Sequence, residues 1–144
     1  QYSAQCFLNA ARVLEEYPLQ RKAGDAEIFM EPVGVSALII PWNSTAGTLC
    51  SKLAFAIAAG CTSVIKPSEF SPLQSRVVTE ALHQAGLPDG IFNILSGRGE
   101  EVGDELSVHP RVAKISFTGS TTVGKLTPLA AAASCTPLTL GRCG

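Results

Sequence analysis

The strongest constraint on the fold is a pair of short apolar runs separated by one helical pattern. Val33–Ile40 (VGVSALII) is too continuous for a half-exposed strand and suits a strand that is buried on both faces. Thr62–Lys66 (TSVIK) is short and rich in β-branched residues, which indicates a second strand. Thr48–Ala59 between them can form a helix that ends at Gly60. This strand–helix–strand order predicts a parallel sheet.

The same alternation continues along the chain. The predicted elements are a helix at Pro72–Ala85, a strand at Ile91–Leu95, an acidic helix at Gly99–Val108 and a strand at Ala113–Phe117. The first of these helices places Leu73, Val77 and Leu82 near one face. The predicted fold class is therefore α/β, a partial doubly wound (Rossmann-like) parallel sheet with flanking helices.

The two ends of the chain depart from this alternation. Ala4–Glu16 is predicted to be a helix, and Tyr17–Glu31 is predicted to be a hairpin that turns at residues 23–25. Leu126–Gly144 shows no clear period, and Pro128 should break or kink the helix that Ser120 opens. The predicted division is a helix and partial hairpin at 1–32, an incomplete α/β domain at 33–125, and an atypical tail at 126–144.

Composition narrows the class of protein further. With 144 residues, 46% hydrophobic and 16% charged, the chain has the size and composition of one folded domain. A net charge of −1 provides no electrostatic field that would attract nucleic acid or an anionic membrane. No apolar run reaches the roughly 20 residues that a membrane-spanning helix needs. The five cysteines form no C-x-x-C pair. This pattern predicts no disulfide framework and no metal site, and it suits the cytoplasm.

Polar or glycine-containing loops follow each of the four predicted strands. These loops contain Trp42–Asn43, Lys66–Glu69, Gly97–Gly99 and Gly119–Ser120. Because the carboxyl ends of parallel strands meet at one edge, we expect the loops to converge there, where ligands bind in sheets of this kind.

Each loop allows a chemical and a structural interpretation. Lys66 and Glu69 can hydrogen-bond ribose hydroxyls, or they can form a solvated ion pair. Gly119–Ser120 can present helix N–H groups to a phosphate, or Ser120 can be an ordinary helix cap. The amide of Asn43 can stabilise an oxyanion, or Asn43 can be a turn residue.

Seven strings, in their order along the chain, carry a resemblance to a known family. They are EPVGV, IIPWN, AIAAG, KPSE, AGLPDGIFN, SGRG and ISFTGSTTVG. The ordered set resembles the first part of the NAD(P)-binding domain of the aldehyde dehydrogenase superfamily, over roughly residues 31–125. The segment before residue 31 also resembles the start of the family's oligomerisation strands.

The resemblance implies roles for individual residues. Asn43 would contribute to the oxyanion hole, and Lys66 and Glu69 would bind the adenosine ribose. The other implied cofactor-binding residues are Ile40, Trp42, Gly97, Gly99, Gly119, Ser120 and Val123. A carboxylate beside the ribose disfavours a 2′-phosphate, so NAD is expected rather than NADP.

The resemblance also implies an enzyme that oxidises an aldehyde to a carboxylic acid through a cysteine thiohemiacetal, transfers hydride to the nicotinamide and forms homo-oligomers.

The sequence departs from the family's pattern at two places. Asn43 is followed by Ser44–Thr45 instead of an apolar step, and CTPLTLGRCG replaces the family's strand ending in Glu-Leu-Gly-Gly-Lys. We therefore expect a fragment that has the cofactor-binding part, lacks the catalytic cysteine domain and is inactive alone. The alternative is a non-catalytic nucleotide-binding or interaction remnant.

Overall fold

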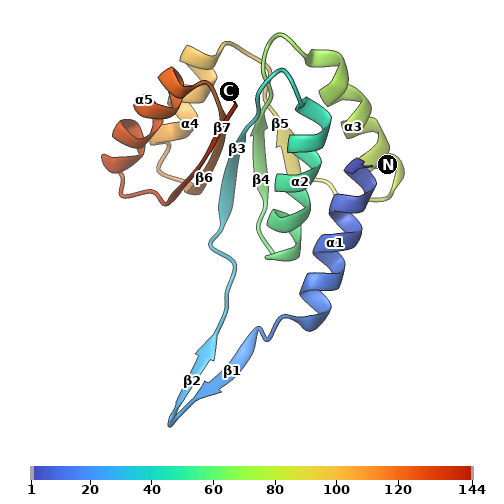
Figure 1. Cartoon of the computed structure of the whole chain (residues 1–144), viewed down its shortest axis with the longest axis vertical. Coiled ribbons are helices and arrows are strands. Elements are labelled where there is room, and N and C mark those ends of the chain that lie inside the picture. Colours follow the sequence, from blue (N-terminus) through green and yellow to red (C-terminus); the bar gives the residue numbers. More distant parts are fainter. Residues whose placement is uncertain (1, 144) are drawn as a thin grey trace.

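The computed structural model describes residues 2–143, which form a parallel sheet between two layers of helices and a separate hairpin (Figure 1). The helices are α1 (Tyr2–Glu16), α2 (Thr45–Ala58), α3 (Pro72–Gln84), η1 (Gly99–Gly103, a π-helical turn), α4 (Asp104–Val108) and α5 (Thr121–Ala132). The strands are β1 (Gln20–Ala23), β2 (Ala26–Phe29), β3 (Val35–Ile39), β4 (Ser63–Lys66), β5 (Phe92–Ile94), β6 (Val112–Gly119) and β7 (Leu138–Arg142). The predicted α/β class is confirmed.

The main sheet has five parallel strands in the order β5-β4-β3-β6-β7. From β3 the chain moves outward through β4 and β5, and it then returns to place β6 on the other side of β3. The order of strands therefore reverses between β3 and β6, where Ile39 pairs with Phe117. In open α/β sheets this reversal opens a crevice at the carboxyl ends of the strands, and ligands bind there.

Helices cover both faces of the sheet. Helices α1, α2 and α3 lie on one face, and α4 and α5 lie on the other (Figure 1). The side chains of β3 alternate between the two layers: Leu38 joins the cluster beneath α2, and Ala37 joins the cluster beneath α4 and α5. Leu49, Leu53 and Ile65 are fully buried in the first cluster, and Ile115 is fully buried in the second. This two-sided burial explains why the strand sequences read as continuous apolar runs.

The N-terminal segment forms the predicted helix and hairpin. Helix α1 packs against α2, and β1 pairs with β2 in an antiparallel register that places Gln20 opposite Phe29. Gly24 makes the turn at a φ of +62°, a left-handed conformation that glycine adopts at little cost. The hairpin projects away from the main sheet (Figure 1), and its side chains are mostly exposed.

The face of α3 that packs on the core differs from the sequence expectation. Leu73 and Val77 are 74% and 64% exposed, whereas Ser75, Val78 and Leu82 are buried. The helix is turned so that Ser75 faces inward, where its hydroxyl donates to the carbonyl of Ser71. Because this hydroxyl has a hydrogen-bond partner, a polar residue can lie on the buried face of the helix. A prediction based only on the spacing of apolar residues does not anticipate this.

The C-terminal segment is more regular than its sequence indicates. The expected break at Pro128 is wrong, because α5 continues to Ala132. Proline removes only the N–H that would reach the Gly124 carbonyl, and burial of Thr127 and Ala131 holds the following turn in place. Strand β7 then pairs with β6, with Leu138 opposite Ile115. The division at 125 and 126 falls inside a helix, and as a functional boundary it stays a prediction.

Within residues 2–143 the structure has no helix that is both long and apolar enough to cross a membrane.

Candidate functional site

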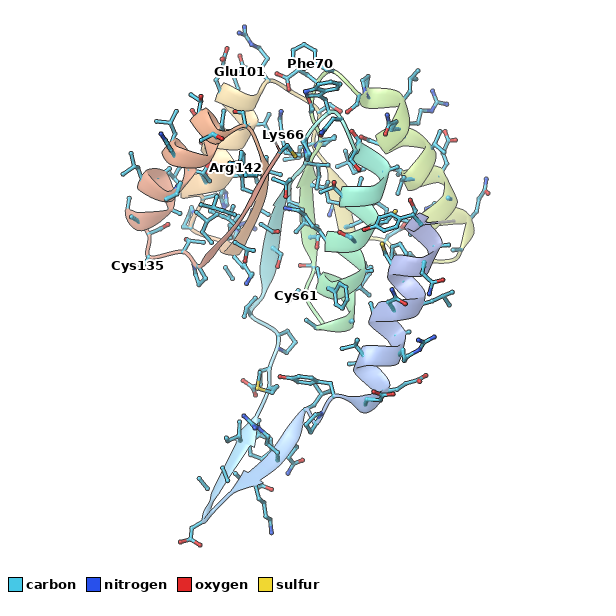
Figure 2. The ribbon with its side chains drawn as sticks, viewed as in Figure 1. Cys61, Lys66, Phe70, Glu101, Cys135 and Arg142 are labelled. Carbon is cyan, nitrogen blue, oxygen red and sulfur yellow. The ribbon has the colours of Figure 1, made fainter. Side chains whose placement is uncertain are left out.

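The polar loops meet at the carboxyl edge of the sheet, as the sequence predicts. Figure 2 shows Lys66 and Arg142 at this edge, with Glu101 nearby on η1, whereas Cys61 and Cys135 lie toward the opposite end of the sheet. The edge therefore has two parts. We call the part after β4 and β5 the ribose side and the part after β6 the phosphate side, after the ligand groups that the family resemblance implies for their residues.

The ribose side is built around an ion pair. The Lys66 side chain is only 4% exposed, and its Nζ donates to Glu69 Oε2 at 2.9 Å. The other carboxylate oxygen, Oε1, accepts from the Gly99 backbone N–H at 3.4 Å. Glu69 thus links the loop after β4 to the loop after β5. Pro67 keeps the backbone of Lys66 extended, which directs the pair outward from the strand.

The electrostatics of this pair keep Glu69 ionised. A hydrogen bond from its own backbone N–H and another from Lys66 lower the pKa of the Glu69 carboxyl. The Glu69 side chain is 38% exposed, so it can still accept hydrogen bonds from a ligand. An ionised carboxylate beside an ammonium donor offers both acceptors and a donor to vicinal hydroxyl groups.

A small cavity of about 150 Å³ adjoins the pair. It is lined by Pro67, Ser68, Glu69, Pro72, Ser75, Ser96 and Gly97. A Cβ at Gly97 would lie 2.5 Å from Val102 Cγ2, so η1 can pack against this loop only because residue 97 lacks a side chain. Of the two predicted glycines, Gly97 is therefore needed for close packing, whereas a Cβ at Gly99 would lie 3.9 Å from Lys66 Nζ, an ordinary contact distance.

The phosphate side is built mainly from backbone. Ser120 is the N-cap of α5, and its Oγ accepts from the Val123 N–H at 3.3 Å. The other N–H groups of the first turn have no partner within a helix, and they carry the positive end of its dipole. A Cβ at Gly119 would lie 2.6 Å from Phe117 Cζ, so the Phe117 ring can pack against the start of α5 only because residue 119 lacks a side chain.

Two cationic side chains flank this helix start. A cavity of about 190 Å³ is lined by Ser120, Thr121, Gly124, Lys125, Leu140, Gly141 and Arg142. Lys125 lies on α5 and Arg142 ends β7. The sequence reasoning missed both: the strand that brings Arg142 to the edge was not predicted, and no motif marked Lys125.

The loop after β3 carries the predicted Trp42 and Asn43, and both are exposed. Thr45 fixes the loop from beneath: its fully buried hydroxyl donates to the Pro41 carbonyl at 2.9 Å and lies 2.5 Å from Ser71 Oγ. Thr45 stands where the family resemblance expected an apolar residue. No feature of the sequence marks it as a residue that links two loops.

The remaining predicted residues divide by exposure. Val123 is 47% exposed on the first turn of α5, close to Ser120. Ile40 is only 2% exposed and packs in the core, and its backbone N–H already donates to the Lys66 carbonyl at 3.0 Å. Residues 2–143 contain no cluster of His, Cys, Asp and Glu that could hold a metal ion.

Comparison with known proteins identifies the family. The family model described as the aldehyde dehydrogenase family matches residues 2–144. The chain belongs to the aldehyde dehydrogenase family. A curated relative, the 3-succinoylsemialdehyde-pyridine dehydrogenase of a Pseudomonas species, is 43% identical over 126 residues. A putative aldehyde dehydrogenase of Staphylococcus haemolyticus is 42% identical over 118 residues.

Solved aldehyde dehydrogenases share the fold. Mutant aldehyde dehydrogenase C of Pseudomonas syringae, in complex with NAD⁺ and octanal, superposes with a TM-score of 0.89 at 41% identity, covering 99% of this chain. Betaine aldehyde dehydrogenase of Staphylococcus aureus, in complex with NAD⁺, superposes with a TM-score of 0.91 at 35% identity over 96% of this chain. The resemblance and the Rossmann-like fold class are thus confirmed.

The 144 residues correspond to only part of these aldehyde dehydrogenases. They span 26% of the Pseudomonas relative and 30% of the aldehyde dehydrogenase C chain. The family's NAD-dependent aldehyde chemistry therefore comes to this chain as a proposal.

Proposed function

We propose that this chain is the nucleotide-binding part of an NAD-dependent aldehyde dehydrogenase that oxidises an aldehyde to a carboxylic acid. The observation that carries the proposal is the arrangement of the carboxyl edge. The Lys66–Glu69 pair stands on one side of the β3/β6 reversal, and the uncapped N–H groups of α5 stand on the other. A dinucleotide has hydroxyl groups and a pyrophosphate in a comparable order.

The residues present fit such a cofactor. Glu69 would accept hydrogen bonds from the ribose hydroxyls, and Lys66 would donate to them. Gly119 and Ser120 would present the start of α5 to the pyrophosphate, with Val123 packing beside it. Gly97 and Gly99 would border the adenine side, and Ile40 and Trp42 would border the cleft after β3.

The chemical step would depend on the loop after β3. NAD, when bound, supplies a nicotinamide that accepts hydride. Asn43 would donate its side-chain amide to the oxygen that becomes negatively charged when the aldehyde carbon is attacked. A donor of this kind contributes about 3–4 kcal/mol to transition-state stabilisation in known cases. The exposure of Asn43 leaves its amide accessible to a substrate.

The 144 residues alone are expected to bind the cofactor without oxidising aldehydes. Strand β7 reads LTLGR and carries no carboxylate that could serve as the general base of the family motif. Cys135 lies in the turn after α5, at the end of the sheet opposite Lys66 (Figure 2). The missing carboxylate in β7 and the distant position of Cys135 favour the second candidate for the isolated 144 residues, a nucleotide-binding protein without catalysis.

Titration calorimetry with NAD tests the proposal. We expect one site per chain, with binding lost in the double variant Lys66→Met with Glu69→Gln. His83→Gln, at an exposed position on α3, is the matched control and should bind as the native chain does. Absence of NAD binding by chain that melts cooperatively would contradict the proposal. If the purified chain formed NADH from aldehydes at a rate above that of a mock purification, the expectation that the isolated 144 residues are inactive would be wrong.

A further inference from the structure

Two buried hydroxyl groups connect the loop after β3 with the loop after β4. Thr45 is the first residue of α2 and Ser71 directly precedes α3, and their side-chain oxygens lie 2.5 Å apart. Thr45 is 0% exposed and Ser71 is 8% exposed. Because both residues are buried among the elements that surround them here, the contact does not depend on an open surface or cavity.

The protons of the two hydroxyls give this contact a direction. A hydroxyl group has one proton to donate. The Thr45 hydroxyl donates to the Pro41 carbonyl at 2.9 Å and lies 3.3 Å from the Trp42 carbonyl oxygen. Since the Thr45 proton is used in this way, Ser71 is the donor between the two hydroxyls. A chain of hydrogen bonds therefore runs from Ser71 through Thr45 to the backbone of the loop after β3, and each bond polarises the next.

Helix capping does not account for this contact. A serine that precedes a helix normally accepts a hydrogen bond from the first turn. Within residues 2–143, the Ser71 hydroxyl makes no such cap bond and lies against Thr45 instead. Thr79 and Thr127 show the common behaviour of a helical threonine, because each donates to the carbonyl four residues before it. Thr45 makes that bond and also contacts a residue 26 positions away.

We propose that Thr45 and Ser71 are positioning residues, and that the hydrogen bond between them holds the Asn43 amide at a fixed place relative to the Glu69 carboxylate. Asn43 lies two residues before Thr45, and Glu69 lies two residues before Ser71. The loop of Glu69 is itself anchored, because its carboxylate accepts hydrogen bonds from a side chain and from a backbone N–H. The bond between the two hydroxyls extends that anchor to the loop of Asn43.

This role rests on the proposed function, in which Asn43 donates to the oxygen that becomes negatively charged. A donor of this kind acts only within a narrow range of positions, and a misplacement of about 1 Å can cost about 100-fold in rate. Asn43 is exposed in a turn, so the packing of its own side chain supplies little of that precision. The hydrogen bond beneath the turn supplies it through the backbone.

The fluorescence of Trp42 tests this proposal, because Trp42 is the only tryptophan and its carbonyl oxygen contacts the Thr45 hydroxyl. Time-resolved anisotropy separates the nanosecond motion of the loop from the tumbling of the whole molecule. In Thr45→Val, which keeps the shape of the side chain without its hydroxyl, we expect the amplitude of loop motion to rise about twofold.

Thr45→Ser distinguishes the hydrogen bond from packing. This variant keeps the hydroxyl and loses a buried methyl group, so the motion of Trp42 should stay as in the native chain although the melting temperature falls. If the side chain of Thr45 only filled space, Thr45→Ser would loosen the loop more than Thr45→Val does.

Ser71→Ala removes the same hydrogen bond from the other loop, and it replaces Thr45→Val if that variant does not fold. It should raise the motion of Trp42 to the same extent, and the double variant should show no larger motion than either single variant, because both remove one bond. Thr79→Val is the matched control. It removes a helical hydroxyl outside the two loops and should leave Trp42 unchanged.

Calorimetry with NAD on the same variants separates this proposal from the proposed function. Absence of NAD binding by the folded native chain would contradict the proposed function, and the anisotropy of Trp42 would still decide whether the two hydroxyls hold the loop. Three results would overturn the positioning role: loop motion that is equal in native, Thr45→Val and Ser71→Ala chains, additive effects in the double variant, or a larger increase in Thr45→Ser than in Thr45→Val.

Discussion

The two sides of the carboxyl edge prepare for a ligand in different ways. On the ribose side, a nearly buried lysine and a half-exposed glutamate already bond to each other and to a backbone N–H. On the phosphate side, the contact groups are mainly the backbone N–H groups of α5, and Lys125 and Arg142 border the space in front of them. Side chains define the first side, whereas main-chain geometry defines the second.

Because of this difference, we expect the ribose side to determine which ligand groups are accepted, and the backbone geometry of the phosphate side to determine where the ligand is held. A ligand on the ribose side must exchange hydrogen bonds with a pair that is satisfied without it, so the outcome depends on the chemical groups it offers. A ligand on the phosphate side meets N–H groups whose positions follow from the helix, whatever side chains surround them. Substitutions on the ribose side should therefore change affinity at constant stability, and those on the phosphate side should change stability together with affinity.

The largest effect is expected for Lys66→Met. Methionine can fill the nearly buried volume of Lys66, and Glu69 is exposed enough to be hydrated without its partner. We expect the melting temperature to stay nearly constant while NAD affinity falls about 10- to 100-fold, because hydrogen bonds to charged groups are worth about 1.5–3 kcal/mol. Calorimetry and thermal melts measure the two quantities. Lys114→Met on β6 is the control, and an equal loss of affinity in that variant would remove the special role of Lys66.

Gly119→Ala should show the opposite behaviour on the phosphate side. The new methyl group would lie 2.6 Å from Phe117 Cζ, and the Phe117 ring is buried at 4% exposure and has little room to shift. We expect a loss of about 1.5 kcal/mol in the free energy of unfolding, within the range for overpacked sites, together with weaker NAD binding. Urea denaturation measures the loss.

Gly103→Ala is the matched control for this substitution. A Cβ at Gly103 meets no atom within 4 Å, so alanine should be tolerated there without loss. If Gly103→Ala destabilised the chain as much as Gly119→Ala, the contact with Phe117 would not be the cause.

Ser120→Ala should have a smaller effect on the same side. It removes one acceptor, the Oγ that bonds to the Val123 N–H, and leaves the backbone of the helix start in place. Loss of an N-cap side chain costs about 1 kcal/mol, so we expect a melting temperature a few degrees lower and a loss of affinity below about tenfold. Ser134→Ala, beyond the C-terminal end of α5, is the control. If Ser120→Ala reduced NAD affinity more than Lys66→Met does, the side chains of the phosphate side would matter more for binding than those of the ribose side, contrary to expectation.

Much of this edge could be predicted from the sequence, because its strands are buried on both faces. The apolar run Val33–Ile40 and the β-branched segment Thr62–Lys66 end within one residue of the ends of β3 and β4, and parallel pairing places the following loops together. Gly60 and Gly86 mark helix ends because their φ angles, +74° and +80°, favour glycine.

The features that sequence reasoning missed depend on tertiary contacts. Strand β7 has mostly exposed side chains and no apolar period, and its backbone pairing with β6 defines it. Pro128 reads as a helix breaker, but the packing of Ala131 outweighs one lost hydrogen bond. Thr45 reads as a polar residue in a loop, and only the folded chain shows its hydroxyl beneath two loops.

The smallest predicted effect concerns which nucleotide the ribose side accepts. We expect the native chain to bind NAD more tightly than NADP, and Glu69→Gln to reduce this preference. A 2′-phosphate would approach the Glu69 carboxylate, and two unit charges 4 Å apart interact by about 4 kcal/mol at an effective dielectric constant near 20. Solvent at the partly exposed Glu69 and the positive charge of Lys66 offset most of this repulsion. The remaining preference is about 1 kcal/mol, or roughly fivefold in affinity.

Titration of both nucleotides against the native and Glu69→Gln chains measures this preference. Because hydrogen bonds lower the pKa of Glu69, the carboxylate stays ionised at neutral pH, and the ratio of the two affinities should be constant there. The preference should decline only in acid, where Glu69 takes up a proton. Glu80→Gln removes a carboxylate of α3 that pairs with Arg76 outside the edge, so it should leave the ratio unchanged. Equal affinities in native chain, or a ratio that Glu69→Gln does not change, would mean that the carboxylate does not face the ribose.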